Sequence, residues 1–276
     1  MSKRKGGLRL AQQVLLIAWL TFVIHLSETL TYSIRLAGVR LGKLAVALSL
    51  SGIILLVSRT SNMIQGPLMG NIIDFAKKNQ DFPLVDQLRV MVGASTLGTL
   101  TAIVLFPSAV ILFSRMIAHL EISGSLPQMV RDSVSIRKLK NARTHLRFPK
   151  LAMLSKLRIG GIPKRLVIMN CAVTAIYTIG VLAALLASAM SLEHSTAASQ
   201  ASGMINGAAT ILLTILIDPQ IGLLTDKVLR REKDVHALNK VFGLLMLSRL
   251  LGTMLAQLLL VPAAYGIKWA VEWLAA

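Results

Sequence analysis

The sequence predicts an all-α integral membrane protein, a polytopic bundle of about six transmembrane helices that forms one membrane domain over residues 1–276. Apolar residues make up 54% of the chain, charged residues only 15%, and the mean hydropathy is +0.67. A soluble domain usually has about 25% charged residues. The charges also gather in a few segments, separated by apolar runs of about 20 residues, the length that crosses the hydrocarbon of a bilayer.

The apolar runs place the spans, in chain order, at residues 10–34, 44–70, 88–114, 166–191, 197–218 and 241–264. A basic N-terminus precedes the first run, but no A-x-A cleavage site follows it at the right place. This favours an uncleaved helix over a signal peptide. In the second run, Pro67 predicts an end or a kink. Pro107 and Pro262 lie near the ends of the third and sixth runs, and Trp269 and Trp273 then follow as interfacial anchors.

Basic residues dominate residues 115–165, the longest segment between spans, and the net charge is +18. We expect this segment to be a cytoplasmic loop against anionic lipid headgroups, either as an amphipathic surface helix or as a solvated loop. Nucleic acid is not expected as a partner, because the basic stretch has almost no interleaved aromatics. Segments 35–43, 115–165 and 227–240 carry 20 Lys and Arg residues against 8 on the other side, which places both termini outside. The basic N-terminus conflicts with this, and a re-entrant segment within 44–75 would resolve the conflict.

A short motif recurs at the ends of the second and fifth spans. Pro67 to Asp74 and Pro219 to Asp226 both read P-x-x-G-x-x-x-D, lie 152 residues apart (219 − 67), and are followed by basic residues. Two halves of three spans each would be inverted relative to one another, which is a common plan of transporters with the substrate site between the halves. An inverted 3+3 repeat is therefore a hypothesis, and its alternative is coincidence, since Pro and Gly are frequent at helix ends.

The first span carries the clearest polar pattern, with Thr21, His25, Glu28, Tyr32 and Arg35 spaced by 4, 3, 4 and 3 residues. This spacing puts all five side chains on one face of a helix. A charge in hydrocarbon costs about 3 kcal/mol or more, so the face should point into the bundle. The functional interpretation is a polar cavity wall that gates or titrates; the alternative is an interhelical ion pair of Glu28 with a basic residue such as Arg59 or Arg249.

Polar residues in the other spans complete the expected chamber. Cationic groups inside a bilayer suit an anionic ligand, and the planar fork of arginine suits phosphate in particular. The residues expected to bind substrate are Arg35, Arg40, Arg59, Asn62, Gln65 and Arg249. Those expected to gate or to titrate are His25, Glu28, Tyr32, Asp74, Asp218 and Asp226.

Sequence motifs of enzymes are missing. The chain has no H-E-x-x-H, no G-x-S-x-G and no Walker sequence. His25 and Glu28 could form half of a metal site, but the other spans lack a second set. The single cysteine, Cys171, permits neither an internal disulfide nor a cysteine-based metal site. We therefore expect no enzyme activity, no cofactor and no metal.

One segment resembles a known family: IHLSETLTYSIRLAGVRLGKLAVALSLSGIILLVSRTSNMIQGPLMG, within residues 25–74, is similar to the Amj family of lipid II flippases, the alternates to MurJ. The matching positions are His25, Glu28, Tyr32, Arg35, Gly38, Arg40, Lys43, Arg59, Asn62, Gln65 and Pro67. The resemblance implies a multi-pass protein of the bacterial cytoplasmic membrane that moves lipid II, the undecaprenyl-diphosphate-linked peptidoglycan precursor, from the inner to the outer leaflet. Lipid II is then the expected partner.

Two other functions remain open on the residues alone. One is an ion- or proton-coupled transporter of a small anionic solute. The other is a membrane enzyme or assembly scaffold of envelope synthesis. Transport of a soluble substrate without any effect on the lipid-linked precursor would select the first, and an essential metal or tight association with cell-wall synthases would select the second.

Overall fold

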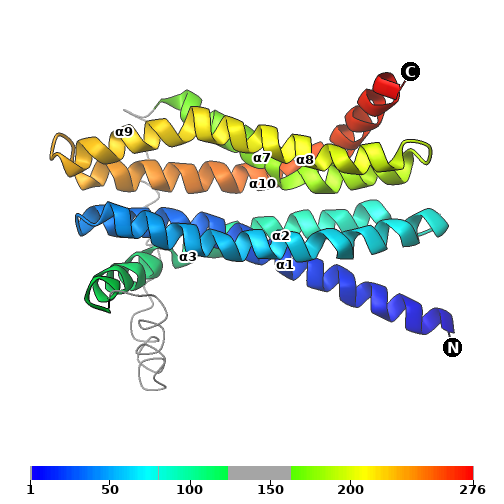
Figure 1. Ribbon diagram of the computed structural model, residues 1–276, viewed down its shortest axis with the longest axis horizontal. Helices are drawn as coiled ribbons and strands as arrows, with labels where there is room; N and C mark the ends of the chain where they lie inside the picture. The colour runs from blue at the N-terminus through cyan, green and yellow to red at the C-terminus, as the bar shows by residue number, and fades with distance from the viewer. Residues whose placement is uncertain (1, 80, 124–162, 276) are drawn as a thin grey trace.

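A computed structural model describes residues 2–79, 81–123 and 163–275, and all its regular structure in these ranges is helical (Figure 1). Within these ranges six helical stretches are long and apolar enough to cross a membrane, so the chain is a multi-pass membrane protein. The elements are α1 (Ser2–Arg40), α2 (Leu44–Lys78), α3 (Leu84–Ser123), α7 (Lys164–Met190), α8 (Ser195–Leu212), the π-helical turn η2 (Leu213–Ile217), α9 (Asp218–Leu229) and α10 (Val235–Ala275).

The helices run past the ends that the apolar pattern predicts. The second helix does not end at Pro67, so that part of the prediction is wrong: α2 continues to Lys78. Pro107 and Pro262 likewise lie inside α3 and α10. Hydropathy marks only the part of a helix that lies in hydrocarbon, whereas backbone hydrogen bonding continues beyond it, and proline is tolerated in such helices. A re-entrant segment within residues 44–75 is also excluded, since α2 is one continuous helix.

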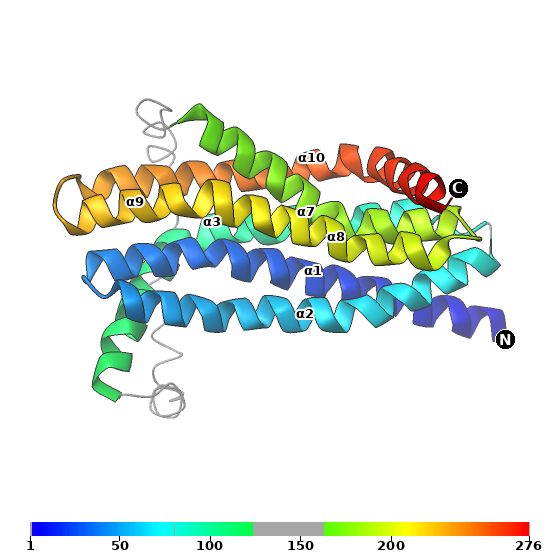
Figure 2. The same cartoon turned by 45° about the horizontal axis from the view of Figure 1, so that its top comes forward.

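The chain ends lie at the same end of the bundle, as an even number of spans requires (Figures 1 and 2). The α1–α2 turn lies at the opposite end (Figure 1). It closes through Gly42, whose φ of +67° is easy for glycine, and Lys43 donates its backbone N–H to the Gly38 oxygen at 2.8 Å. The predicted surface helix or loop at residues 115–165 lies mostly outside the described residues; up to Ser123 this stretch continues α3.

Each half of the bundle is built around its first helix. In the first half α1 packs along both α2 and α3, and in the second half α7 packs along both α8 and α10. Glycines allow the closest approaches, as small residues do in membrane bundles. A Cβ on Gly98 of α3 would clash with the backbone oxygen of Phe22, and a Cβ on Gly252 of α10 would lie 2.5 Å from the backbone oxygen of Cys171.

The helix boundaries of the two halves correspond. Shifting α2 by 152 residues places it at 196–230, against 195–229 for the fifth span, and shifting α3 places it at 236–275, against 235–275 for α10. This agreement supports the inverted-repeat hypothesis without establishing it. The halves differ at one point: the fifth span contains the η2 turn just before Pro219, whereas α2 is α-helical through Pro67.

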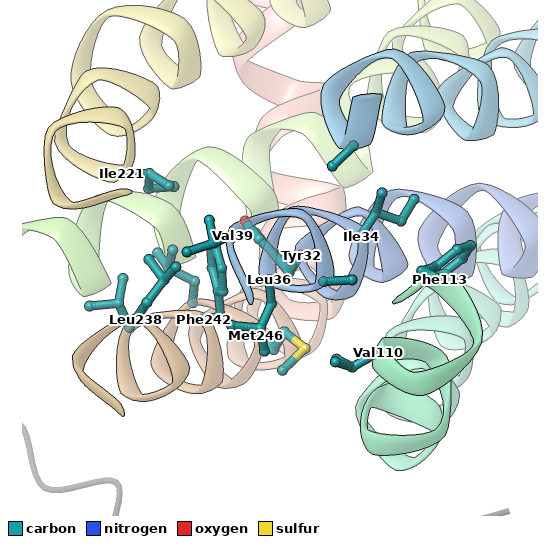
Figure 3. Packing of buried hydrophobic residues seen from close by; sticks show 14 of the residues in the cluster. Tyr32, Ile34, Leu36, Val39, Val110, Phe113, Ile221, Leu238, Phe242 and Met246 are labelled. Atoms are coloured by element: carbon teal, nitrogen blue, oxygen red, sulfur yellow. The ribbon is translucent and has the colours of Figure 1, made fainter. Parts of the chain in front are cut away.

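Two apolar clusters join the halves. One gathers residues from the end of the bundle that holds the α1–α2 turn, including Tyr32, whose ring centroid lies 5.5 Å from that of Phe242 (Figure 3). The other gathers residues nearer the opposite end, including Ile17 of α1, Met69 of α2 and Leu260 of α10. Between these clusters five of the described helices contribute buried polar side chains, so the bundle has a buried polar layer near its middle; examples are His25 of α1, Ser61 of α2, Thr99 of α3, Thr174 of α7 and Thr253 of α10.

Candidate functional site: a buried polar layer between the halves

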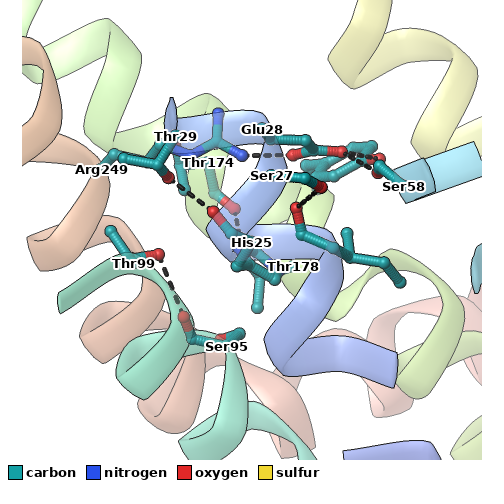
Figure 4. A network of polar contacts seen from close by, with 12 residues as sticks. His25, Ser27, Glu28, Thr29, Ser58, Ser95, Thr99, Thr174, Thr178 and Arg249 are labelled. Atoms are coloured by element: carbon teal, nitrogen blue, oxygen red, sulfur yellow. Dashed lines mark hydrogen bonds and ion pairs between the residues drawn. The ribbon is translucent and has the colours of Figure 1, made fainter. Parts of the chain in front are cut away.

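Glu28 lies at the centre of the polar layer. One of its carboxylate oxygens accepts hydrogen bonds from the Ser58 hydroxyl at 2.7 Å and from the Tyr177 hydroxyl at 2.9 Å. The other oxygen forms an ion pair with Arg249 (Figure 4). The partners come from α2, α7 and α10, so this one carboxylate of α1 links four helices and both halves of the bundle.

The layer extends around this pair. Arg249 also lies close to the Tyr32 side chain, and the side chain of Asn62 lies close to Tyr177. About two turns along α2 from Ser58, the Gln65 amide donates to the Thr21 hydroxyl at 2.7 Å. The predicted stripe on the first span therefore points into the bundle, as the cost of exposing its charges to lipid requires.

Burial makes the Glu28–Arg249 pair energetically important. The Glu28 side chain is 12% exposed and that of Arg249 is 7% exposed. Removing one member of such a pair strands the other charge in a poorly solvated place. The interhelical ion pair that the sequence left open as an alternative is thus present, with Arg249 rather than Arg59 as the partner.

Three buried polar atoms beside the pair have no hydrogen-bond partner within the described part of the chain. They are Nδ1 of His25, Oγ1 of Thr174 and Nε of Arg249, on α1, α7 and α10 (Figure 4). Buried polar groups have a hydrogen-bond partner in the great majority of cases, and a buried group without one costs about 1–3 kcal/mol. The layer therefore has more hydrogen-bonding capacity than its own side chains use.

Two cavities between helices of the described ranges lie away from the predicted site residues, and the expected wet chamber stays a prediction. A cavity of about 620 Å³ lies between α1, α3 and α10 and is lined mostly by apolar groups such as Leu97 and Met254. A second cavity of about 580 Å³ lies between α8 and α10 and is lined by groups such as Met204 and Val271. Neither is lined by any of the predicted site residues, because in this conformation the charges of the layer contact one another directly.

Arg59 differs from the other predicted residues. It lies in the middle of α2, directly after Ser58, and its side chain is exposed. No hydrogen bond or ion pair to another described residue involves its guanidinium. An arginine at this depth of a membrane span costs about 3 kcal/mol or more unless it meets an anion or water.

Arg35 and Arg40 lie closer to the end of α1. Arg35 approaches Asp218, the first residue of α9, with a separation of 3.5 Å and side chains that are 27% and 37% exposed. The Arg40 guanidinium donates to the Asn239 side-chain oxygen at 3.2 Å. Both contacts connect the first half to the second at the end of the bundle that holds the α1–α2 turn.

A matching connection lies toward the other end, where the Lys77 ammonium of α2 donates to the Ser195 hydroxyl of α8 at 2.5 Å. The acidic residues Asp74 and Asp226 are exposed near the ends of α2 and α9, away from the polar layer. Over the described ranges, no three His, Cys, Asp or Glu residues come together as metal ligands would.

Sequence reasoning missed Ser58, which donates to Glu28. A signal for it existed, since Ser58, Asn62 and Gln65 are spaced by 4 and 3 residues and so share one face of α2. A lone serine in an apolar span is too common to mark a site without that spacing.

These features define a class: a polytopic membrane protein whose two three-span halves meet at a buried ion pair. A family model described as "Amj: Alternate to MurJ" matches residues 20–271, and the chain belongs to this family. The chain is similar to a Bacillus subtilis (strain 168) protein named "Lipid II flippase Amj", with 44% identity over 262 residues, which is 95% of this chain and 97% of that protein. No solved structure matches the chain.

Proposed function

We propose that this protein is a lipid II flippase of the bacterial cytoplasmic membrane, which moves the precursor from the inner to the outer leaflet. The observation that carries the proposal is the 44% identity to the Bacillus subtilis flippase over 95% of this chain. The near-complete coverage of that protein, 97%, means that no separate part is needed to account for the same activity. A transporter role also agrees with a chain that consists mainly of membrane-spanning helices.

Translocation of such a lipid has one main physical obstacle. The cargo carries a diphosphate, a disaccharide and a pentapeptide, and each unpaired polar group costs several kcal/mol in hydrocarbon. The polyprenyl tail can stay in the lipid throughout. The protein therefore has to offer hydrogen-bond and charge partners at mid-depth along a path that opens sideways to the bilayer.

Arg59 is our proposed first contact for the diphosphate. Its guanidinium is exposed, has no partner among the residues that the structure describes, and lies halfway along α2, so it can meet a headgroup that enters from the side. The planar fork can bond two phosphate oxygens at once. Asn62, which lies about one turn further on and is half-buried, leads from there to Tyr177 and so to the polar layer.

The polar contacts near the two ends of the bundle are our proposed gates. Arg35–Asp218 and Arg40–Asn239 connect the halves near one end, and Lys77–Ser195 connects them toward the other. In alternating access, one end opens while the other stays closed. Asp74 and Asp226 lie at equivalent places in the repeated motif, and we retain their proposed gating role. We also retain the proposed contact of the basic segment 115–165 with anionic headgroups.

Complementation tests this proposal. In cells depleted of other lipid II flippases, expression of the protein should restore growth and the surface labelling of newly made lipid II. Arg59→Gln should reduce the labelling at least tenfold, whereas Arg59→Lys should retain part of it because the charge stays. The matched control is Arg165→Gln, which removes an exposed cation at the start of α7 and should have no effect.

Three outcomes would count against the proposal or a part of it. Absence of surface lipid II with a protein that reaches the membrane at normal levels would reject lipid II as the cargo. Wild-type labelling with Arg59→Gln would keep the flippase but remove Arg59 from its path. Accumulation of a small soluble anion in liposomes, without any lipid II exposure, would select an anion transporter instead.

A further inference from the structure

The Glu28–Arg249 pair restrains the two halves at the place where a transporter has to open. Arg249 belongs to α10 and Tyr177 to α7, both in the second half, whereas Glu28 and Ser58 belong to the first. Any separation of the halves in this layer pulls the carboxylate away from Arg249 and Tyr177. Each charge then needs a replacement partner, because a buried charge without one is strongly disfavoured.

The replacements differ for the two charges. A buried carboxylate that loses its cation is neutralised most directly by a proton. A guanidinium stays protonated under all ordinary conditions, so it needs another anion. Nε of Arg249, Oγ1 of Thr174 and Nδ1 of His25, which have no hydrogen-bond partner among the described residues, lie at this place. The guanidinium N–H and the threonine hydroxyl can donate to further anionic oxygens, and so can His25 in the tautomer with its proton on Nδ1. A carboxylate has two oxygens, whereas a diphosphate has several, so the larger anion fits the unused donors better.

We propose that Arg249 is the buried anion receptor of the site and that Glu28 occupies it between cargo molecules. The diphosphate of a lipid headgroup displaces the carboxylate, and Glu28 takes up one proton from water as it leaves. When the lipid departs, Glu28 releases that proton and pairs with Arg249 again. This inference rests on the proposed function for the kind of cargo, and it adds a coupling between cargo and proton.

The groups that face Glu28 permit this exchange. Arg249 faces it from α10, Tyr177 from α7, and His25 and Tyr32 lie on α1 itself. From α2 it meets the uncharged Ser58. Arg249 is thus the charged group that contacts the carboxylate directly, so loss of that one contact changes the carboxylate's preference for a proton the most.

The test uses the purified full chain in phosphatidylcholine nanodiscs, with farnesyl diphosphate as the probe. Binding and proton uptake are measured together, with a pH indicator in weak buffer. The wild type should take up about one proton for each diphosphate bound, and its affinity should rise as pH falls, up to about tenfold per pH unit. Farnesol and inorganic diphosphate, tested in parallel, should both bind at least tenfold more weakly.

Two variants separate this exchange from a structural ion pair. Glu28→Gln removes the competing anion but keeps an acceptor for Ser58 and Tyr177, so it should bind farnesyl diphosphate about tenfold more tightly, without proton uptake or pH dependence. Combining it with Arg249→Gln removes both charges, which avoids a stranded buried charge, and should weaken binding at least tenfold. Circular dichroism of each variant checks that it folds.

Each other outcome overturns a defined part. Equal binding by the wild type and Glu28→Gln, with no proton uptake, would make the pair structural. Unchanged binding by the double variant would remove Arg249 as the receptor. Equally tight binding of inorganic diphosphate would reject a lipid headgroup as the ligand. If the probe binds as expected but cells expose no lipid II, only lipid II as the cargo is rejected. If cells expose lipid II but Glu28→Gln binds the probe no differently from the wild type, only the exchange is rejected.

Discussion

Replacing Arg249 by methionine should destabilise the protein far more than a surface ion pair would predict. The substitution leaves Glu28, whose side chain is 12% exposed, with two neutral donors, Ser58 and Tyr177, and no cation. Stranding a buried charge in this way costs about 3–5 kcal/mol. Glu28→Gln strands Arg249 in turn, but the guanidinium keeps the nearby Tyr32 hydroxyl and the neutral glutamine amide as polar neighbours, so we expect about 2–3 kcal/mol there.

The double variant with Arg249→Met and Glu28→Gln should recover most of this loss in stability. With both charges gone, the layer holds only neutral groups, and buried ion pairs replaced together are often neutral in stability. We expect the free energy of unfolding of the double variant to lie within about 2 kcal/mol of the wild type, so the coupling energy should exceed about 3 kcal/mol. The assay is SDS titration into mixed micelles, followed by circular dichroism and checked by refolding.

A matched control uses the other ion pair of the same helix. Arg35→Met with Asp218→Asn removes a pair whose side chains are 27% and 37% exposed. Water screens such a pair, so each single change should cost less than about 1 kcal/mol, and the coupling should be smaller still. If the Arg249 and Glu28 losses simply added in the double variant, or matched those of Arg35 and Asp218, the argument from burial would be refuted.

Two further predictions concern packing and topology. Gly252→Ala should cost about 1–3 kcal/mol, since its Cβ would lie 2.5 Å from the Cys171 oxygen, whereas Gly203→Ala, with open space around it, should change stability by less than about 1 kcal/mol; thermal unfolding in detergent distinguishes them. In a Cys171→Ala background, cysteines placed at Leu41 and Leu192 should react with an impermeant maleimide from opposite sides of the membrane, because they lie at opposite ends of the bundle. Labelling of both from one side would contradict the six-span topology.

The fold class could be predicted because bilayer physics leaves few choices. A span needs about 20 apolar residues and must satisfy its own backbone, so hydropathy alone counts the helices. The helix ends could not be predicted in the same way. Pro67 reads as a break in any soluble helix, yet α2 continues to Lys78. Hydropathy falls where the headgroups begin, but nothing there requires the hydrogen bonds to stop.

The site could be predicted in part. The spacing of His25, Glu28 and Tyr32 fixed their shared inward face, since the helix period leaves no other arrangement. Pairing across helices was beyond the sequence, because either Arg59 or Arg249 could reach Glu28 until the relative rotation of α2 and α10 was known. The exposure of Arg59 was equally hidden, since a helix pattern shows a common face but not which neighbour covers it.

The charges of the layer break the correspondence of the two halves. Under the shift of 152 residues, His25 corresponds to Tyr177, and both lie near Glu28, whereas Glu28 itself corresponds to Gly180 and Arg249 to Leu97. A fully symmetric pair of halves would place two carboxylates and two guanidiniums in one poorly solvated layer, where like charges repel strongly. One acid and one base, drawn from different halves, avoid that repulsion and leave one receptor. A single receptor suits a cargo that carries a single diphosphate.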